Sequence, residues 1–591
     1  MSWSWRTKPR SIIKTVEWFP YFAALEGQNW EEKSEEVSRK DQKAVHPVRR
    51  TYIYAAHGEE DAWLSGITYE DYLHGQKDQK ETESNGRNDK TTFEFFGFGY
   101  VDRNGLIRVT EAGRRIVNGT FDQEDYLKQL LKMRVPNYTY EPAKMKKGNF
   151  VFPFQVILQA FSHFESLNRS ELALLFGCTD TAQIPVAVDA IADFKKQYAG
   201  LKNKNDTASV WKLFEHVFVK HYGSQPNRTD SYHSYAEALA RTLVYTGLFS
   251  ASGRSNATKI RVAEHSRMKV QLLQEKYEFV FPETIQSLED YMAWYGSARN
   301  VLLPWENVQD RCSIIRDKLK LLEEKRRHTE YDLSQTDTVP VKEILRQLKA
   351  AEEAEDVSQL KRLENLTSSE ITSHNEEVFI HYLSKTEQER RNILDKYEDI
   401  LANDDMSALW LEVNTWKSLI AVRGEQTVKR NFKIEDDLTP KSFAPGMGNT
   451  PDMELYKNGY IIVPEVSLMT GVQQWEHEAS SVVDHVLGFI KRYEKVQVLG
   501  LFLSSRIHVR TMWQFFILNR DCWMGTPVPV IPLTIRQYMD ILRHIYSNDL
   551  EIDDLKLLLD AMAKSTAHCD NYRIWENCIE QSIRLWKEGT L

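Results

Sequence analysis

The sequence is poor in cysteine and lacks the cysteine spacing of a zinc site. Its 591 residues include five cysteines, an odd number, and none of them form a C-x-x-C pair. They are Cys178, Cys312, Cys522, Cys569 and Cys578. Closely spaced pairs are typical of structural zinc sites, and an even set is typical of a disulfide framework. The pattern argues against both and predicts reduced thiols.

Long apolar runs and an excess of positive charge are also missing. The N-terminus, MSWSWRTKPR, has no apolar stretch of the kind found in signal peptides, so we expect a soluble cytoplasmic protein with no membrane contact. The formal net charge of -9 argues against a uniformly basic coat for nucleic acid. It leaves DNA binding open, because affinity depends on local clusters of Lys and Arg that face phosphates.

Apolar and aromatic residues are plentiful. Hydrophobic residues make up 42% of the chain, and there are 15 tryptophans. This is ample for packed interiors, but 591 residues are too many for one core. We therefore expect three or four domains.

The most informative stretch is residues 449–467, NTPDMELYKNGYIIVPEVS. Asn458-Gly459 predicts a two-residue type I′ hairpin turn. Counting outward from this turn places Asp452 directly opposite Glu465. Opposed residues on one face have Cβ atoms roughly 5 Å apart, close enough for both carboxylates to hold one hard cation. The alternative is a solvated turn with two exposed acids.

The flanking segments favour a buried sheet. Residues 460–463 form an apolar run that predicts a strand covered on both faces, and 496–503 and 528–533 show the same pattern. Residues 406–422 and 474–494 have helical periodicity; the first carries Glu412 and the second carries Glu478 and His485. The predicted order is helix, hairpin, helix, strand, strand, helix, which is a mixed α/β sheet with acids at one edge.

This layout resembles the PD-(D/E)XK nuclease core. Residues 444–485, from APGMGNTPDMEL to SSVVDH, are similar to the catalytic region of the AlwI/BstNBI group of type IIS restriction and nicking endonucleases. The resemblance covers most of the chain, more weakly outside 405–490. It implies that Asp452, Glu465 and Glu412 are metal-binding acids and that Glu478 and His485 belong to the catalytic set. It also implies a prokaryotic source.

The resemblance implies DNA phosphodiester hydrolysis with one or two Mg²⁺ ions, which Mn²⁺ can replace. The ions would polarise the phosphate and lower the pKa of a bound water. Glu478 would be an outer ligand or would orient His485; an exposed helix acid is the other interpretation.

One position departs from the superfamily pattern, because Ser467 stands where the motif has a lysine. That lysine normally helps to position or deprotonate the attacking water. No Lys or Arg lies between Lys457 and Lys491, so a basic group from this region must be His477 or His485. We favour His485 as the functional histidine and a structural role for His477.

The N-terminal half is interpreted as a recognition unit. Residues 96–119 and 236–262 each predict a hairpin next to a helix, which resembles the wing of a winged-helix domain. Small solvated hairpins are the alternative. Basic side chains of these segments and of the N-terminus are candidates for contacts with double-stranded DNA. They are Arg6, Arg10, Arg114, Arg115, Arg254, Lys259 and Arg261.

Long charged helices, 311–331 and 341–363, separate the two halves. Twenty helical residues span on the order of 30 Å, or roughly nine base pairs, which suits an enzyme that cuts to one side of its site. The predicted fold is multidomain α+β. It comprises winged-helix-like recognition domains at 1–145 and 146–303, a helical linker at 304–400 and a PD-(D/E)XK-like cleavage domain at 401–591.

The predicted function is a type IIS endonuclease that binds a short asymmetric site. One cleavage domain cuts one strand, so double-strand cleavage needs a transient homodimer or a separate small catalytic subunit; otherwise the protein is a nickase. An inactive winged-helix regulator is the alternative that Ser467 suggests. A ribonuclease lacks the aromatic signatures of common RNA-binding modules. The recognition sequence and cut offset cannot be derived from these patterns.

Overall fold

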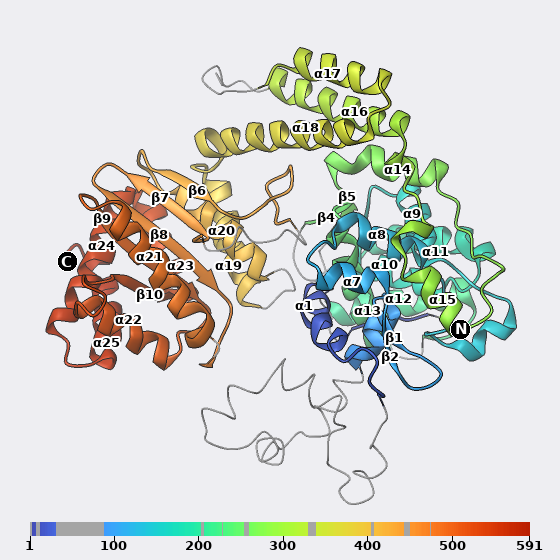
Figure 1. The fold of residues 1–591 in the computed structure, drawn as a ribbon, viewed down its shortest axis with the longest axis horizontal. Coiled ribbons are helices and arrows are strands. Elements are labelled where there is room, and N and C mark those ends of the chain that lie inside the picture. The colour runs from blue at the N-terminus through green and yellow to red at the C-terminus, as the bar shows by residue number, and fades with distance from the viewer. Residues whose placement is uncertain are drawn as a thin grey trace, which may run out of the picture. The chain divides into compact units, whose positions relative to one another are not determined.

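The computed structural model describes residues 3–7, 12–30, 88–201, 206–226, 229–252, 259–328, 339–402, 407–441, 450–472 and 474–590 (Figure 1). Its contacts divide the chain into two compact units. Unit 1 comprises Met1–Glu324 and Val339–Thr367, and unit 2 comprises Lys325–Thr338 and Ser368–Leu591. None of the helices in the described ranges is both long and apolar enough to cross a membrane. The finer division into four predicted parts stays a prediction.

Unit 1 is mainly helical and contains two small antiparallel sheets. One sheet pairs β1 (Gly99–Val101) with β2 (Ile107–Val109), and the other has the order β3-β5-β4. These three strands are β3 (Ser166–Asn168), β4 (Phe249–Ser252) and β5 (Lys259–Val262). The helices are α1 (Ile12–Ala23), α7 (Glu111–Val117), α8 (Gln123–Lys132), α9 (Pro153–His163), α10 (Arg169–Leu174), α11 (Ile184–Ala199), α12 (Thr207–Tyr222), α13 (Thr229–Tyr245), α14 (Arg267–Lys276) and α15 (Leu288–Tyr295).

Both hairpins that the sequence predicts are present. Thr110 ends the first hairpin and caps α7, since its hydroxyl accepts the Gly113 N–H at 3.2 Å. A hydroxyl in this position satisfies one of the orphan N–H groups of the first helical turn. The second hairpin follows α13, and β5 also pairs with β3. That third strand was not foreseen, because its three residues are too few for a periodic pattern.

Gly113 allows α7 to pack directly on the first hairpin. A Cβ at this position would lie 2.1 Å from the Phe98 carbonyl oxygen and 2.6 Å from the Phe19 ring. We expect Gly113→Ala to lower the free energy of unfolding by about 3 kcal/mol, because neither backbone nor ring has room to move. Urea denaturation checks this. Gly488→Ala is the control, since nothing lies within 4 Å of its Cβ, and it should be neutral or slightly stabilising.

Most of the predicted linker forms three packed helices, where the sequence predicts two. They are α16 (Val308–His328), α17 (Val341–Glu353) and α18 (Val357–Val378). Apolar residues of all three form one buried cluster that includes Ile315, Ile344 and Leu360. The single helix predicted over 341–363 is wrong. Glu355 has a φ of 50°, which ends α17, and the Asp356 carboxylate then accepts the Gln359 N–H at 2.9 Å as α18 begins.

Unit 2 is built on a five-stranded mixed sheet with the order β10-β9-β8-β7-β6 (Figure 1). The first three strands in this order run parallel, and β7 and β6 are antiparallel to their neighbours. The strands are β6 (Thr427–Arg430), β7 (Met453–Lys457), β8 (Tyr460–Ser467), β9 (Gln497–Ser504) and β10 (Val530–Thr534). This confirms a mixed α/β arrangement in the C-terminal part.

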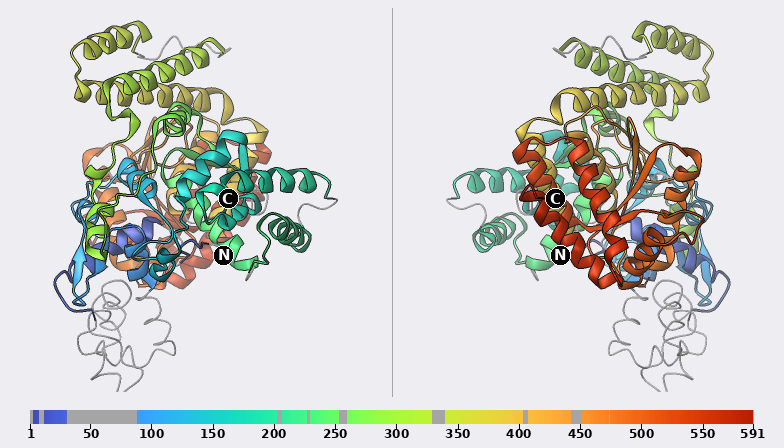
Figure 2. Two further views of the ribbon diagram at one scale, coloured as in Figure 1. Left: turned by 90° about the vertical axis from the view of Figure 1, so that its right-hand side faces the viewer. Right: turned by 90° about the vertical axis from the view of Figure 1, so that its left-hand side faces the viewer.

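Helices surround this sheet and complete the core. They are α19 (Glu387–Leu401), α20 (Ser407–Ala421), α21 (Ser480–Arg492), α22 (Val509–Arg520), α23 (Ile535–Asn548), α24 (Ile552–Ser565) and α25 (Tyr572–Lys587). Tyr397, Ser418 and Tyr538 form a buried hydrogen-bonded group that joins α19, α20 and α23. The last two helices, red in Figure 2, pack against each other.

Two details of the predicted order are wrong. Helix α22 is absent from the predicted order, although parallel strands such as β9 and β10 need a crossover connection, and so is the half-exposed edge strand β6. The predicted type I′ turn is also wrong. Of its two central residues only Gly459 has a positive φ, 90°, whereas a type I′ turn needs positive φ at both.

Candidate active site

Asp452 and Glu465 lie side by side at the open end of the β7–β8 hairpin. In this hairpin Leu455 pairs with Ile462. Extending the same register toward the open end places Asp452 opposite Glu465, as the sequence predicts. Asp452 Oδ2 accepts the Val466 N–H at 2.8 Å, and Glu465 Oε2 accepts the Asp452 N–H at 3.4 Å. Glu465 is only 7% exposed. Two carboxylates are therefore fixed together at the edge of an apolar sheet.

Helix α20 brings a third carboxylate, Glu412. Its neighbours Leu411 and Val413 are buried in the unit 2 core. Trp416 is buried as well, and its Nε1–H donates to the Val428 carbonyl at 3.3 Å, which ties the helix to β6. Glu412 itself is half-buried and close enough to Glu465 for their charges to interact. The structure thus brings the three predicted acids together.

Glu478 and His485 reach the same sheet edge from the following helix. Residues Gln474–Ala479 form a π-helical segment, η9, rather than the predicted α-helix, and it continues into α21. The Ser467 hydroxyl lies near the Glu478 carboxylate and lowers its pKa, against the effect of burial. His485 Nδ1 lies 2.5 Å from Glu465 Oε1. Ser467, which stands where the motif has a lysine, therefore lies near the Glu478 carboxylate. The basic group beside the acids is His485.

The electrostatics of this group are those of crowded, buried acids. Burial, together with the charges of Glu465 and Glu478, raises the pKa of Glu412 to about 7. Burial and the charges of Glu465 and Glu412 raise the pKa of Asp452 well above its usual range. Burial also raises the pKa of Glu478. The hydrogen bond to Glu465 raises the pKa of His485, although burial opposes it. Like charges at this spacing are unfavourable unless a cation joins them.

The donors suit a hard divalent cation, because all of them are carboxylate oxygens. Among the residues that the structure describes, however, no three His, Cys, Asp or Glu side chains are arranged as a closed metal site. The carboxylates of Glu412, Asp452 and Glu465 would have to converge further to share one ion. Metal binding here therefore stays a prediction.

Asn431 is a residue of this region that the sequence analysis missed. Its N–H donates to the Asp452 carbonyl at 2.9 Å. Its Nδ2 donates to the Pro451 carbonyl at 2.8 Å and to Glu454 Oε1 at 3.0 Å. Asn431 follows edge strand β6, which has no apolar pattern, so no sequence signal places it beside Asp452.

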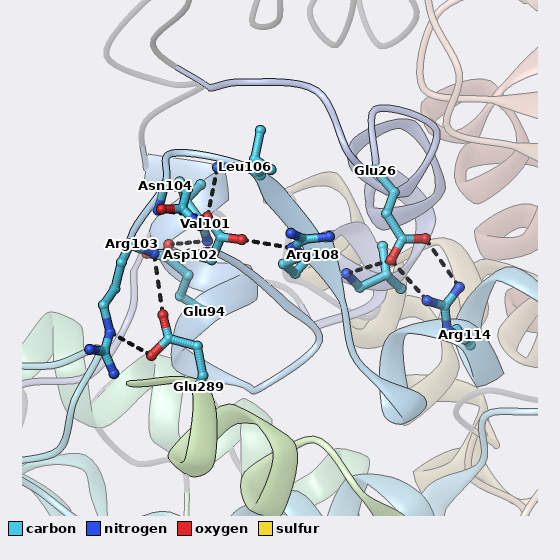
Figure 3. Close-up of polar contacts among 11 residues, drawn as sticks. Glu26, Glu94, Val101, Asp102, Arg103, Asn104, Leu106, Arg108, Arg114 and Glu289 are labelled. Carbon is cyan, nitrogen blue, oxygen red and sulfur yellow. Dashed lines mark hydrogen bonds and ion pairs between the residues drawn. The ribbon is translucent and has the colours of Figure 1, made fainter. Parts of the chain in front are cut away.

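The candidate DNA contacts of the first hairpin are ion-paired within unit 1. Arg114 makes a bidentate ion pair with Glu26, with N–O distances of 2.8 and 3.1 Å, and its side chain is 59% exposed (Figure 3). Arg115 pairs with Asp125 at 2.7 Å. The turn also carries Arg103, paired with Glu289 at 2.7 Å, as Figure 3 shows. Exposed pairs of this kind contribute at most about 1 kcal/mol, so a phosphate can displace the carboxylate.

The remaining candidate DNA contacts differ in how exposed their side chains are. Arg6 is half-buried, and its guanidinium donates to Thr92 Oγ1 at 3.3 Å and to the Asn88 carbonyl at 3.2 Å, so its contact with DNA stays a prediction. Lys259 and Arg261 are exposed on β5. Arg10 and Arg254 lie outside the described residues.

No curated protein sequence matches the chain. Among solved structures, the small subunit of the heterodimeric restriction endonuclease R.BspD6I aligns over 32% of this chain and 98% of its own, with 22% identity and a TM-score of 0.29. The sequence profile of the AlwI restriction endonuclease family matches residues 95–541. Because that match spans well over half of the chain, this protein belongs to the AlwI restriction endonuclease family.

Proposed function

We propose that this restriction endonuclease is of type IIS: unit 1 binds a short asymmetric sequence in double-stranded DNA, and unit 2 hydrolyses a phosphodiester bond a few base pairs away. The observation that carries this proposal is the group formed by Glu412, Asp452, Glu465 and His485 at one sheet edge. Such a group has no structural benefit, because it buries mutually repelling acids. An inactive regulator would have no reason to keep it.

The division of roles follows from the contacts. Glu412, Asp452 and Glu465 would hold Mg²⁺ or Mn²⁺, and the ion would supply Lewis-acid polarisation of the phosphate and a more acidic water. Glu465 keeps His485 protonated to higher pH and fixes its ring through the 2.5 Å contact. A protonated imidazole at this place can orient the water or donate to the developing negative charge. It thereby replaces the lysine absent at Ser467.

The strand order of unit 1 supports winged-helix recognition. Helix α9 precedes β3, α13 precedes the β4–β5 hairpin, and the last strand lies between the other two. Among the residues of helix α13 only Asp230 is exposed, and Arg241 of this helix pairs with Glu237 at 2.6 Å. DNA contacts of this module are therefore expected on the exposed hairpin strand, at Lys259 and Arg261, rather than along α13.

The test is incubation of the full-length protein with supercoiled plasmid and Mg²⁺, with Asp452→Ala in parallel. Discrete linear fragments, absent with the variant, indicate double-strand cleavage through a homodimer. Open circles nicked at defined positions indicate a nickase or a large subunit that needs a small catalytic partner. Intact plasmid with both proteins, in Mg²⁺ and Mn²⁺ and across varied substrates, rejects the catalytic proposal and favours a DNA-binding regulator.

We expect His485→Gln to lower the single-turnover cleavage rate by about 10² to 10³-fold with DNA affinity unchanged, because an acid–base group contributes in this range. His477→Gln is the matched control, since His477 is an exposed histidine of the same helix and should lose less than about threefold. Quenched-flow or gel assays with enzyme in excess measure both. Equal losses in the two variants contradict the role assigned to His485.

A further inference from the structure

Gln474, the first residue of η9, makes four hydrogen bonds in unit 2 through one buried amide. Its side chain is 0% exposed. The two N–H groups of Nε2 are shared among three oxygens: the Met469 carbonyl at 2.8 Å, Ser504 Oγ at 2.9 Å and the Arg506 carbonyl at 2.8 Å. Oε1 accepts the His508 N–H at 2.7 Å. One side chain thus joins the loop after β8, the end of β9 and the loop that leads into α22.

This junction lies at the sheet edge that carries the acids. Ser504 is the parallel partner of Ser467, and Ser467 follows Glu465 by two residues. The carboxyl ends of neighbouring parallel strands meet at the same edge of a sheet, where ligands of open α/β sheets bind. The Ser467 hydroxyl also lies near the Glu478 carboxylate, whose pKa it lowers. Gln474 therefore borders the site on one side and begins the helix that supplies Glu478 on the other.

The helix that Gln474 begins needs such an anchor. Segment η9 is π-helical, a geometry that is rare and that occurs mainly as short segments at functional sites. A second contact holds the same segment, because the Arg510 guanidinium lies 5.2 Å from the centre of the Trp475 ring. Both attachments join η9 to the start of α22. The position of Glu478 is therefore set by contacts with distant parts of the chain rather than by regular helix geometry alone.

We propose that Gln474 is a positioning residue of the active site, which holds η9 so that the Glu478 carboxylate stands against Ser467 and beside Glu465. This inference rests on the proposed nuclease function. It assigns a role to Glu478 as well, because a displaced η9 removes that carboxylate while leaving Asp452, Glu465 and Glu412 on their own elements. Gln474 touches no substrate and acts through Glu478.

The test variant is Gln474→Glu in the full-length protein. It keeps the size and the oxygen that accepts from His508, but places a carboxylate oxygen against the carbonyls of Met469 and Arg506. We expect the single-turnover rate to fall by about 10² and DNA affinity to stay within about twofold, since misplacement of a catalytic group by about 1 Å has this effect. Gln426→Glu is the matched control. Its Nε2 likewise donates to two backbone carbonyls, of Leu419 and Val422, but it has no link to η9, and cleavage should persist.

A double-mutant cycle separates positioning from general destabilisation. In the Glu478→Gln background, Gln474→Glu should lower the single-turnover rate by less than about threefold. The reason is that the effects of two substitutions are not additive when one residue acts through the other. An equal loss in both backgrounds overturns the inference, and so does an equal loss with Gln426→Glu. If Glu478→Gln alone leaves no measurable cleavage, hydrogen exchange decides. Faster exchange confined to residues 474–480 supports the inference, and unchanged or unit-wide exchange overturns it. Absence of cleavage by the unsubstituted protein rejects the proposed function itself.

Discussion

Asp452→Asn is expected to lower cleavage by on the order of 10³-fold or more, about 4 kcal/mol of barrier, while making the metal-free protein more stable. The activity is lost because a neutral amide is a poor ligand for a hard cation. The gain in stability has a separate cause. Asparagine keeps an oxygen for the Val466 N–H but removes an acid whose ionisation is opposed by burial and by the charges of Glu465 and Glu412. We expect a gain of about 1 kcal/mol in urea denaturation with EDTA.

Asp553→Asn is the informative control, because this acid contacts the same hairpin with attractive partners. It pairs with Lys457 and accepts the Tyr460 hydroxyl at 2.9 Å. The Lys457 hydrogen bond lowers the pKa of Asp553. This substitution should keep cleavage and lose stability, the opposite of Asp452→Asn. Retained cleavage in Asp452→Asn, or a loss of stability in EDTA like that of Asp553→Asn, contradicts the assignment of Asp452.

The hairpin could be predicted because the residues that determine it are close together in the sequence. A turn dipeptide fixes the register, and strand periodicity of two then places Asp452 and Glu465 without any knowledge of the rest of the chain. The apolar run of β8 is equally local, since it is buried along nearly its whole length. The turn type was wrong for a related reason. Asn-Gly is compatible with more than one turn, and the choice depends on the twist of a sheet that continues into β6 and β9.

What could not be predicted depends on contacts between distant residues. Arg6 belongs to a basic N-terminus, but its hydrogen-bond partners Asn88 and Thr92 lie more than eighty residues away in the sequence. Arg114 pairs with Glu26, also remote in sequence. Likewise, the π-helical form of residues 474–479 depends on packing against the end of β9 and the start of α22. Helical periodicity finds such a segment but does not report its turn geometry.

Stability of the metal-free protein is expected to fall as pH rises from about 5 to 7, and Mg²⁺ is expected to reverse this trend. The pKa of Glu412 is about 7 in the folded protein and 4.5 ordinarily, so between these values the folded state binds more protons than the unfolded state. Unfolding free energy therefore decreases with pH through that window, by at most about 1.4 kcal/mol per pH unit for this group. Below the window both states are protonated, and above it both are ionised.

Mg²⁺ selects the ionised carboxylates, so its stabilising effect should grow with pH over the same range, following the ratio of its concentration to its dissociation constant. Thermal unfolding at pH 5 to 8 measures how stability depends on pH, once in EDTA and once in Mg²⁺. Glu412→Gln provides the reference, because it removes this titration together with one of the charges that raise the pKa of Asp452. The difference between the two proteins in EDTA should widen as pH rises, with the variant more stable near pH 7.5. Parallel curves would mean that Glu412 titrates like an exposed acid, and the crowding on which the metal proposal depends would then be absent in solution.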